Sequence, residues 1–190
     1  MTSLLQSIIN KSPILFNLNL IQNRFIDDIQ NNFDKSFHST ILSDKTTFII
    51  AFAICINEKN TTLYSIFVNS IQNNLISENE LSEIHSIVSI MNMNNSLYSF
   101  KSKMNNETYN NYPIGLNMSS FAKTNIDKIN FELIALTISN INQCKPCTVH
   151  HEKKCVELGI SNEQIYKAIQ LSSFVKSLCV FEYSKSEISQ

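Results

Sequence analysis

Apolar residues recur every three or four positions along six stretches of the chain, the spacing that places them on one face of an α-helix. These stretches predict helices at residues 48–57, 61–74, 79–91, 128–141, 148–158 and 162–183. We expect the Asn-rich runs between them, at 92–96 and 105–112, to form loops. The second run lies in a predicted connecting loop at 101–120. With only two glycines and three prolines in 190 residues, an all-α fold is favoured over tight hairpins and short strands.

The two halves of the chain resemble each other when the sequence is shifted by 83 residues. Eight identities then fall in order, with one gap at Gly159: Asp44, Lys45, Phe48, Asn57, Leu75, Ile76, Ser77 and Ser89 match residues of the second half. This pattern predicts two pseudo-repeats in a single domain, 1–190. Its parts are an N-terminal helical segment at 1–43, a degenerate repeat at 44–100, the connecting loop and a catalytic repeat at 121–190.

Four residues of the second half have no chemical counterpart in the first half. The 83-residue shift aligns Glu132, Cys144, Cys147 and His151 with Ile49, Thr61, Tyr64 and Val68. A shift of 84 aligns them with Phe48, Asn60, Leu63 and Phe67, which offer no better chemistry. This asymmetry indicates that the four residues act together in a function.

Composition and charge narrow the class of protein. Fifteen basic and sixteen acidic residues give a net charge of −1, and Arg24 is the only arginine, so we expect no nucleic-acid partner. The longest apolar run, 48–56, is about half of a membrane span, and residues 1–10 lack the charged start of a secretory signal. We therefore expect a soluble cytoplasmic protein. In that compartment a Cys-x-x-Cys pair is typical of redox or metal chemistry.

The segment 142–155 concentrates three of the five cysteines and two of the four histidines. Pro146 suits the first turn of a helix, which places Cys144 at the helix entrance and Cys147 in its first turn. Free N–H groups and the helix dipole favour a thiolate there, and the spacing permits a disulfide. His151 lies one turn beyond Cys147 and can accept its proton, directly or through a water. His150 is a rival for that role.

Glu132 is the only charged residue in the stretch 130–141. Its helical neighbours Ile129, Ala135 and Leu136 are apolar, so its carboxylate is expected to point inward and to need a partner. A helical hairpin would bring it nearer to His151 than to Cys144. The order predicts a proton relay that ends in a nucleophilic cysteine beside a resolving thiol. The other cysteines, Cys55, Cys155 and Cys179, are interpreted as small core residues.

The arrangement of Glu132, the Cys144–Cys147 pair and His151 resembles the AhpD family of alkylhydroperoxidases, within the carboxymuconolactone decarboxylase superfamily. Residues 18–25, 91–98, 114–133, 139–144 and 150–161 also resemble this family, so the resemblance covers nearly the whole chain. It implies a two-repeat helical fold, assembled as a homotrimer. It also implies an antioxidant peroxidase that reduces alkyl hydroperoxides with electrons from a lipoyl group, and that reduces the peroxiredoxin AhpC.

Residue roles follow from the same resemblance. Cys147 would form the sulfenic acid, and Cys144 would donate a proton and then close a disulfide with Cys147. Glu132 and His151, rather than His150, would form the relay. No bound cofactor is implied, because the lipoyl group belongs to a subunit of a dehydrogenase complex. Several members carry His directly before the second cysteine, where this chain has Pro146, so tuning by that imidazole is absent.

Two other classes stay open. A general thiol-disulfide oxidoreductase or a decarboxylase of the same superfamily is the first alternative, since any dithiol can exchange with disulfides. A zinc module is the second, with Cys144, Cys147, His151 and Cys155 as ligands. On a continuous helix Cys147 and Cys155 lie about 12 Å apart along the axis, too far to share one zinc, so at most three of them fit.

Overall fold

A computed structural model describes residues 3–11, 24–71, 75–104, 106–122 and 124–183. Within these ranges every regular element is a helix, which confirms the predicted all-α class. In order they are α1 (Ser3–Lys11), α3 (Arg24–Phe37), α4 (Asp44–Asn57), α5 (Thr61–Ser70), α6 (Glu78–Lys103), α7 (Thr108–Asn111), the short 3-10 helix η1 (Ser119–Ala122), α8 (Lys128–Ile141), α9 (Lys145–Glu157) and α10 (Asn162–Tyr183). Among the described residues, none of these helices is long and apolar enough to cross a bilayer.

Most predicted helices are present, and capping residues explain where they begin. Helices α8 and α10 have the predicted bounds, 128–141 and 162–183. Helix α4 starts before residue 48 because the Ser43 hydroxyl accepts a hydrogen bond from the Thr46 N–H at 3.1 Å. Helix α5 ends at Ser70, and the end of its predicted range, 72–74, lies outside the described residues.

The Asn-rich run at 92–96 lies inside α6, so the loop predicted there is wrong. The side chain of Asn92 donates to the Val88 carbonyl at 2.9 Å and to Asn57 Oδ1 at 2.8 Å, and Asn95 donates to Ser139 Oγ at 3.1 Å. Partners on other helices thus satisfy amides that would otherwise favour a loop. The expected loop at 105–112 contains the short helix α7. Of the run 18–25, only Arg24 and Phe25, at the start of α3, are described.

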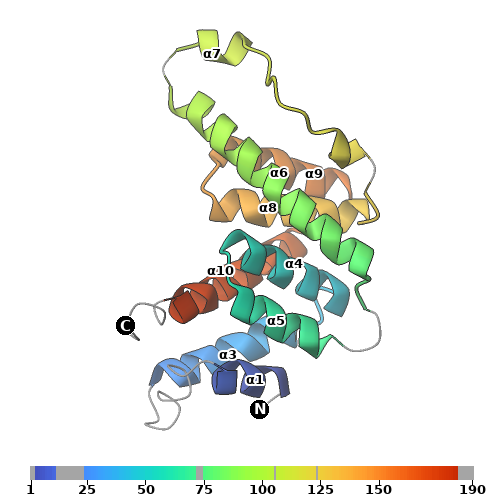
Figure 1. The fold of residues 1–190 in the computed structure, drawn as a ribbon, viewed down its shortest axis with the longest axis vertical. Coiled ribbons are helices and arrows are strands. Elements are labelled where there is room, and N and C mark those ends of the chain that lie inside the picture. The colour runs from blue at the N-terminus through green and yellow to red at the C-terminus, as the bar shows by residue number, and fades with distance from the viewer. Residues whose placement is uncertain (1–2, 12–23, 72–74, 105, 123, 184–190) are drawn as a thin grey trace.

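Helices α4 and α8 form the centre of the molecule. Every residue from 49 to 55 on α4 and from 133 to 139 on α8 is buried, as expected for helices covered on all sides. They pack against each other, and both also contact α6 and α10. Figure 1 shows α1 and α3 at one end of the molecule and α6 crossing it diagonally. The segment between Lys103 and Lys128, which contains α7 and η1 and is called the arm below, has α7 at the other end. Helix α9 packs on α8 and completes a helical hairpin.

The α4–α5 and α8–α9 turns have the same backbone geometry. Lys59 and Gln143 adopt positive φ angles of 57° and 56°. The following residue donates its N–H back into the preceding helix in both turns: Asn60 to Cys55 at 2.9 Å, and Cys144 to Ser139 at 3.0 Å. These positions are 84 residues apart. At the hairpins, Phe48 and Phe67 therefore correspond to Glu132 and His151, whereas repeats over the full segments stay a prediction.

Candidate active site

Two cysteines occupy the start of α9. Cys144 is the N-cap residue, and a proline lies in the first turn, the position that the sequence predicts for Pro146. The sulfurs of Cys144 and Cys147 are bonded at 2.08 Å. Cys144 is completely buried, whereas the side of α9 that carries Cys147 faces a cavity and leaves this residue 7% exposed. A substrate in that cavity would therefore meet Cys147 first.

Glu132 on α8 and His151 on α9 form a hydrogen-bonded carboxylate–imidazole pair across the hairpin. Oε2 of Glu132 lies 2.7 Å from Nδ1 of His151, and the side chains are only 16% and 14% exposed. A carboxylate can only accept, so the proton between them belongs to Nδ1 of His151. In the neutral imidazole Nε2 is then the acceptor, the state needed to take a proton from a thiol.

The surroundings of Glu132 differ in part from the expectation. Ala135 and Leu136 are buried, but Ile129 is 46% exposed, so the apolar neighbours do not enclose the carboxylate fully. Of the two histidines, His151 contacts Glu132, while His150 is exposed and stacks edge-on against His151, with ring centroids 5.1 Å apart. The geometry favours His151 as the base.

A cavity of about 510 Å³ adjoins Cys147 and brings residues from three helices and the connecting arm together. That volume is in the range of sites for small organic ligands. It is lined by Met91, Asn94, Tyr98, Met118, Phe121, Phe131, Glu132, Pro146, Cys147, His150 and His151. The wall is mainly apolar, and Glu132, His150 and His151 are among its polar residues. Sequence reasoning missed the α6 and arm residues, because no local spacing connects them to the cysteines.

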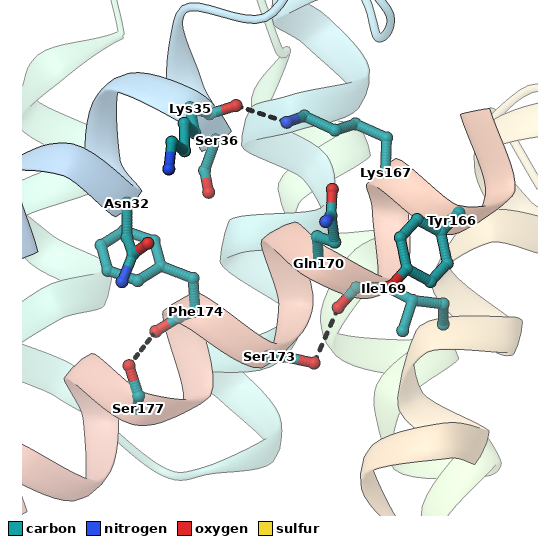
Figure 2. A pocket seen from close by; sticks show the side chains of 10 residues that line it. All are labelled: Asn32, Lys35, Ser36, Tyr166, Lys167, Ile169, Gln170, Ser173, Phe174 and Ser177. Atoms are coloured by element: carbon teal, nitrogen blue, oxygen red, sulfur yellow. Dashed lines mark hydrogen bonds between the residues drawn. The ribbon is translucent and has the colours of Figure 1, made fainter. Parts of the chain in front are cut away.

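A second cavity, of about 470 Å³, lies between α3 and α10 and is shown in Figure 2. The Lys167 amine donates to the Lys35 carbonyl across this groove. The hydroxyls of Ser173 and Ser177 donate to carbonyls of their own helix, at 2.8 and 2.7 Å. These polar groups are already paired with backbone carbonyls, and the described residues that line the groove include no cysteine or histidine. The first cavity is therefore the candidate active site.

The other three cysteines are buried and carry free thiols. Burial, together with the carboxylates of Glu132 and Glu152, raises the pKa of Cys155 to about 12. A hydrogen bond with the Cys179 thiol, and burial, raise the pKa of Cys55 well above its usual value. Neutral, buried thiols make poor nucleophiles. Among the described residues, no group of three or more His, Cys, Asp or Glu side chains is arranged to hold a metal ion.

Asparagines fix the turn that leads into Cys144. Asn142, the C-cap residue of α8, accepts from Asn57 at 3.1 Å and donates to Asn92 at 3.2 Å and to Asn95 at 3.1 Å. Asn92 donates back to Asn57 at 2.8 Å and so closes a ring of three amides from α4, α6 and the α8 cap. The Cys-x-x-Cys segment is thus held by hydrogen bonds to two other helices.

The chain is similar in sequence to proteins of a known family. Residues 108–180 match the model of the carboxymuconolactone decarboxylase family. The alkyl hydroperoxide reductase AhpD of Corynebacterium kroppenstedtii is 30% identical over 154 residues, 81% of this chain and 87% of that protein. The proteins of the same name from Solibacter usitatus and Rhodopseudomonas palustris are 30% and 29% identical, over 81% and 82% of this chain and 86% of each relative.

Proposed function

This chain belongs to the AhpD family of alkyl hydroperoxide reductases, and from that membership we propose that it reduces alkyl hydroperoxides at Cys147. The observation that carries the proposal is the disulfide between Cys144 and Cys147 beside an apolar cavity. Cys147 lines this cavity, and so do the paired side chains of His151 and Glu132. A redox pair, a base and an apolar wall are what a two-thiol reduction of an organic peroxide requires.

The proposed reaction begins in the reduced protein. His151, oriented by Glu132, takes the Cys147 proton, and the thiolate attacks the terminal oxygen of the hydroperoxide. The O–O bond breaks, Cys147 becomes a sulfenic acid, and the alkoxide leaves as the alcohol with a proton from Cys144. The Cys144 sulfur then attacks Cys147, water leaves and the disulfide forms. In total, one hydroperoxide and two thiols give one alcohol, one water and one disulfide.

The same disulfide would be reduced by the dithiol of a lipoyl group on a carrier subunit. One lipoyl sulfur attacks Cys147, the more exposed sulfur, and the second displaces it, which leaves two protein thiols and an oxidised lipoyl ring. We propose the peroxiredoxin AhpC as a protein partner. The reduced Cys144–Cys147 pair would reduce the disulfide of AhpC and become oxidised itself. We also propose a homotrimer, with a native mass three times 21.7 kDa, from the resemblance to the family. Val149 and Val156, two exposed apolar side chains on one face of α9, would be available to such an interface.

A general thiol-disulfide oxidoreductase is the second candidate. Cys147 is only 7% exposed and Cys144 is fully buried, so a small peroxide can enter the cavity, whereas a protein disulfide without a fitted docking surface, such as that of insulin, has poor access. Offering oxidised insulin and tert-butyl hydroperoxide in parallel, with dihydrolipoamide as reductant, separates the two. Consumption of the hydroperoxide alone supports the peroxidase. Consumption of insulin disulfides alone contradicts it.

The cysteine roles have a direct test. The Cys144→Ser protein should form a sulfenic acid on Cys147 that dimedone traps, because the nucleophile remains and the resolving thiol is gone. The Cys147→Ser protein should consume no hydroperoxide. Mass spectrometry of dimedone adducts checks both, and an adduct on Cys144 in the Cys147→Ser protein would mean that the roles are reversed.

A further inference from the structure

Asn94 on α6 places a buried polar atom in the wall of the cavity beside Cys147. Its Oδ1 is buried and has no hydrogen-bond partner among the described residues. Most of the α6 and arm residues that line the cavity are apolar, and Asn94 is the amide among them. A buried acceptor without a partner is costly, so such groups mark sites of strain or of ligand binding.

The neighbouring asparagines show that α6 does not leave its amides unpaired as a rule. Asn92 and Asn95, two positions before and one after, both donate to and accept from other side chains. One further amide oxygen, Asn130 Oδ1, lacks a partner among the described residues, but Asn130 does not line this cavity, and its Nδ2 donates to Asp127, the N-cap residue of α8. In the described part of the chain, Asn94 alone combines a buried, unpaired amide oxygen with a place in the cavity wall.

We propose that Asn94 is a substrate-binding residue that accepts the hydrogen bond of the hydroperoxide O–H and so directs the terminal oxygen toward Cys147. A hydroperoxide carries one donor, on the same oxygen that the thiolate attacks. Its alkyl group then lies among Met91, Met118 and Phe121. Because the terminal oxygen is held at a fixed position, a larger fraction of bound hydroperoxide is oriented for in-line attack of the sulfur on the O–O bond. This inference rests on the proposed peroxidase function.

The test compares two oxidants of the same cysteine pair. Reduced protein is treated with tert-butyl hydroperoxide or with diamide, which forms the disulfide without an O–O–H group, and thiol loss is followed by stopped flow. The ratio of the two rate constants isolates peroxide recognition from thiolate reactivity and from partial misfolding. Asn94→Leu keeps the size and removes the acceptor, so we expect the ratio to fall about tenfold from the wild-type value.

Two further variants make the result specific. Asn94→Asp retains an acceptor at the same place, and its ratio should stay within about threefold of wild type, even where its added charge slows both oxidants. Asn130→Ala removes the other amide oxygen that has no partner among the described residues, and the ratio of the two rate constants should not change. An unchanged ratio in Asn94→Leu, a fall in Asn94→Asp equal to that in Asn94→Leu, or an equal fall in Asn130→Ala overturns the role of Asn94. Failure of the wild-type thiols to react with the hydroperoxide contradicts instead the proposed function.

Discussion

In the proposed relay Glu132 would act on Cys147 only through His151, because its carboxylate lies 2.7 Å from Nδ1 of that histidine. Replacing Glu132 with Gln keeps the shape but turns an obligate acceptor into a group that can also donate. The imidazole then loses both its fixed tautomer and the charge that stabilises its protonated form. The proposed relay therefore depends on whether the His151 proton stays on Nδ1.

We predict that Glu132→Gln slows alkylation of reduced Cys147 by iodoacetamide at neutral pH by about tenfold or more. The rate is measured from pH 5 to 10 by mass spectrometry. Glu157→Gln is the matched control, since Glu157 pairs with Lys154 on the outer side of α9 and should leave the rate unchanged. Equal pH profiles for wild type and Glu132→Gln would show that Glu132 is only structural.

Cys155 should remain a thiol through the whole catalytic cycle, because its pKa is raised to about 12. Peptide mapping after one equivalent of hydroperoxide should find Cys144 joined to Cys147 and Cys155 reduced. Iodoacetamide at neutral pH should label Cys155 only after denaturation. A peroxide-induced bridge that includes Cys155 would contradict this assignment.

The raised pKa of Cys155 also predicts how stability depends on pH. The folded state holds this proton more tightly than the unfolded chain, whose thiol titrates near about 8.5. The resulting stabilisation is complete below that value and is lost as pH rises through about 12. Cys155→Ala lacks this titration, so its unfolding free energy in urea should fall less than that of wild type between about pH 9 and about pH 11. Parallel curves for the two proteins would contradict the raised pKa.

At the scale of elements, the turn between α8 and α9 is held from outside the hairpin. Asn142 hydrogen-bonds to Asn57, Asn92 and Asn95, which come from α4 and α6. Gln143 then takes a left-handed conformation, and Cys144 caps α9 without a side-chain hydrogen bond. The position of the cysteine pair therefore depends on amides far away in the sequence.

Asn142→Ala should lower the free energy of unfolding by about 1–3 kcal/mol, because Asn57, Asn92 and Asn95 each lose a hydrogen-bond partner. Urea denaturation followed by circular dichroism measures this. Asn110→Ala, in the exposed helix α7, is the control and should not shift the midpoint. A midpoint for Asn142→Ala equal to that of wild type would mean that the turn holds itself.

The same amides explain how far the sequence predicts the elements. Hydrophobic periodicity and local caps are enough to place α8 and α10 at their bounds, since both signals lie within each helix. The second half of α6 was not predictable in this way, because its asparagines are paired with Asn57, Asn142 and Ser139 from other helices. Local preference favours a loop there, and tertiary partners reverse it.

At the scale of the whole molecule, the site combines what spacing predicts with what only the fold assembles. The approach of Glu132 to His151 follows from two helices joined by a short turn. The Cys-x-x-Cys spacing keeps the two sulfurs close enough to form a disulfide. The cavity does not follow from the sequence, because Asn94 and Tyr98 come from α6 and Met118 from the arm after α7. Sequence alone thus gives the reacting groups, and the packing of distant elements gives the place for a substrate.

The α4–α5 and α8–α9 hairpins differ at the two positions of the proposed relay. In the first, Phe48 and Phe67 occupy the positions of Glu132 and His151, and their rings pack edge to face with centroids 6.4 Å apart. Both pairs join the two helices of a hairpin, but the aromatic pair does so without removing charge from water. A largely buried carboxylate–imidazole pair gains little net stability after its desolvation cost, whereas apolar contact is favourable throughout. We therefore expect the Glu132–His151 pair to add little stability to the second hairpin, as suits a pair whose proposed role is chemical.

Replacing the polar pair with apolar residues of similar size should separate stability from function. We predict that the double variant Glu132→Met with His151→Phe unfolds at the same urea concentration as wild type or a higher one, because apolar replacement of a buried ion pair is often neutral or stabilising, by up to about 4 kcal/mol. Its Cys147 alkylation should be at least as slow as that of Glu132→Gln, since no base remains. Phe67→Ala, at a fully buried position of the first hairpin, should by contrast cost about 3–5 kcal/mol. A double variant that unfolds well below wild type would show that the Glu132–His151 pair holds the second hairpin together, as the aromatic pair holds the first.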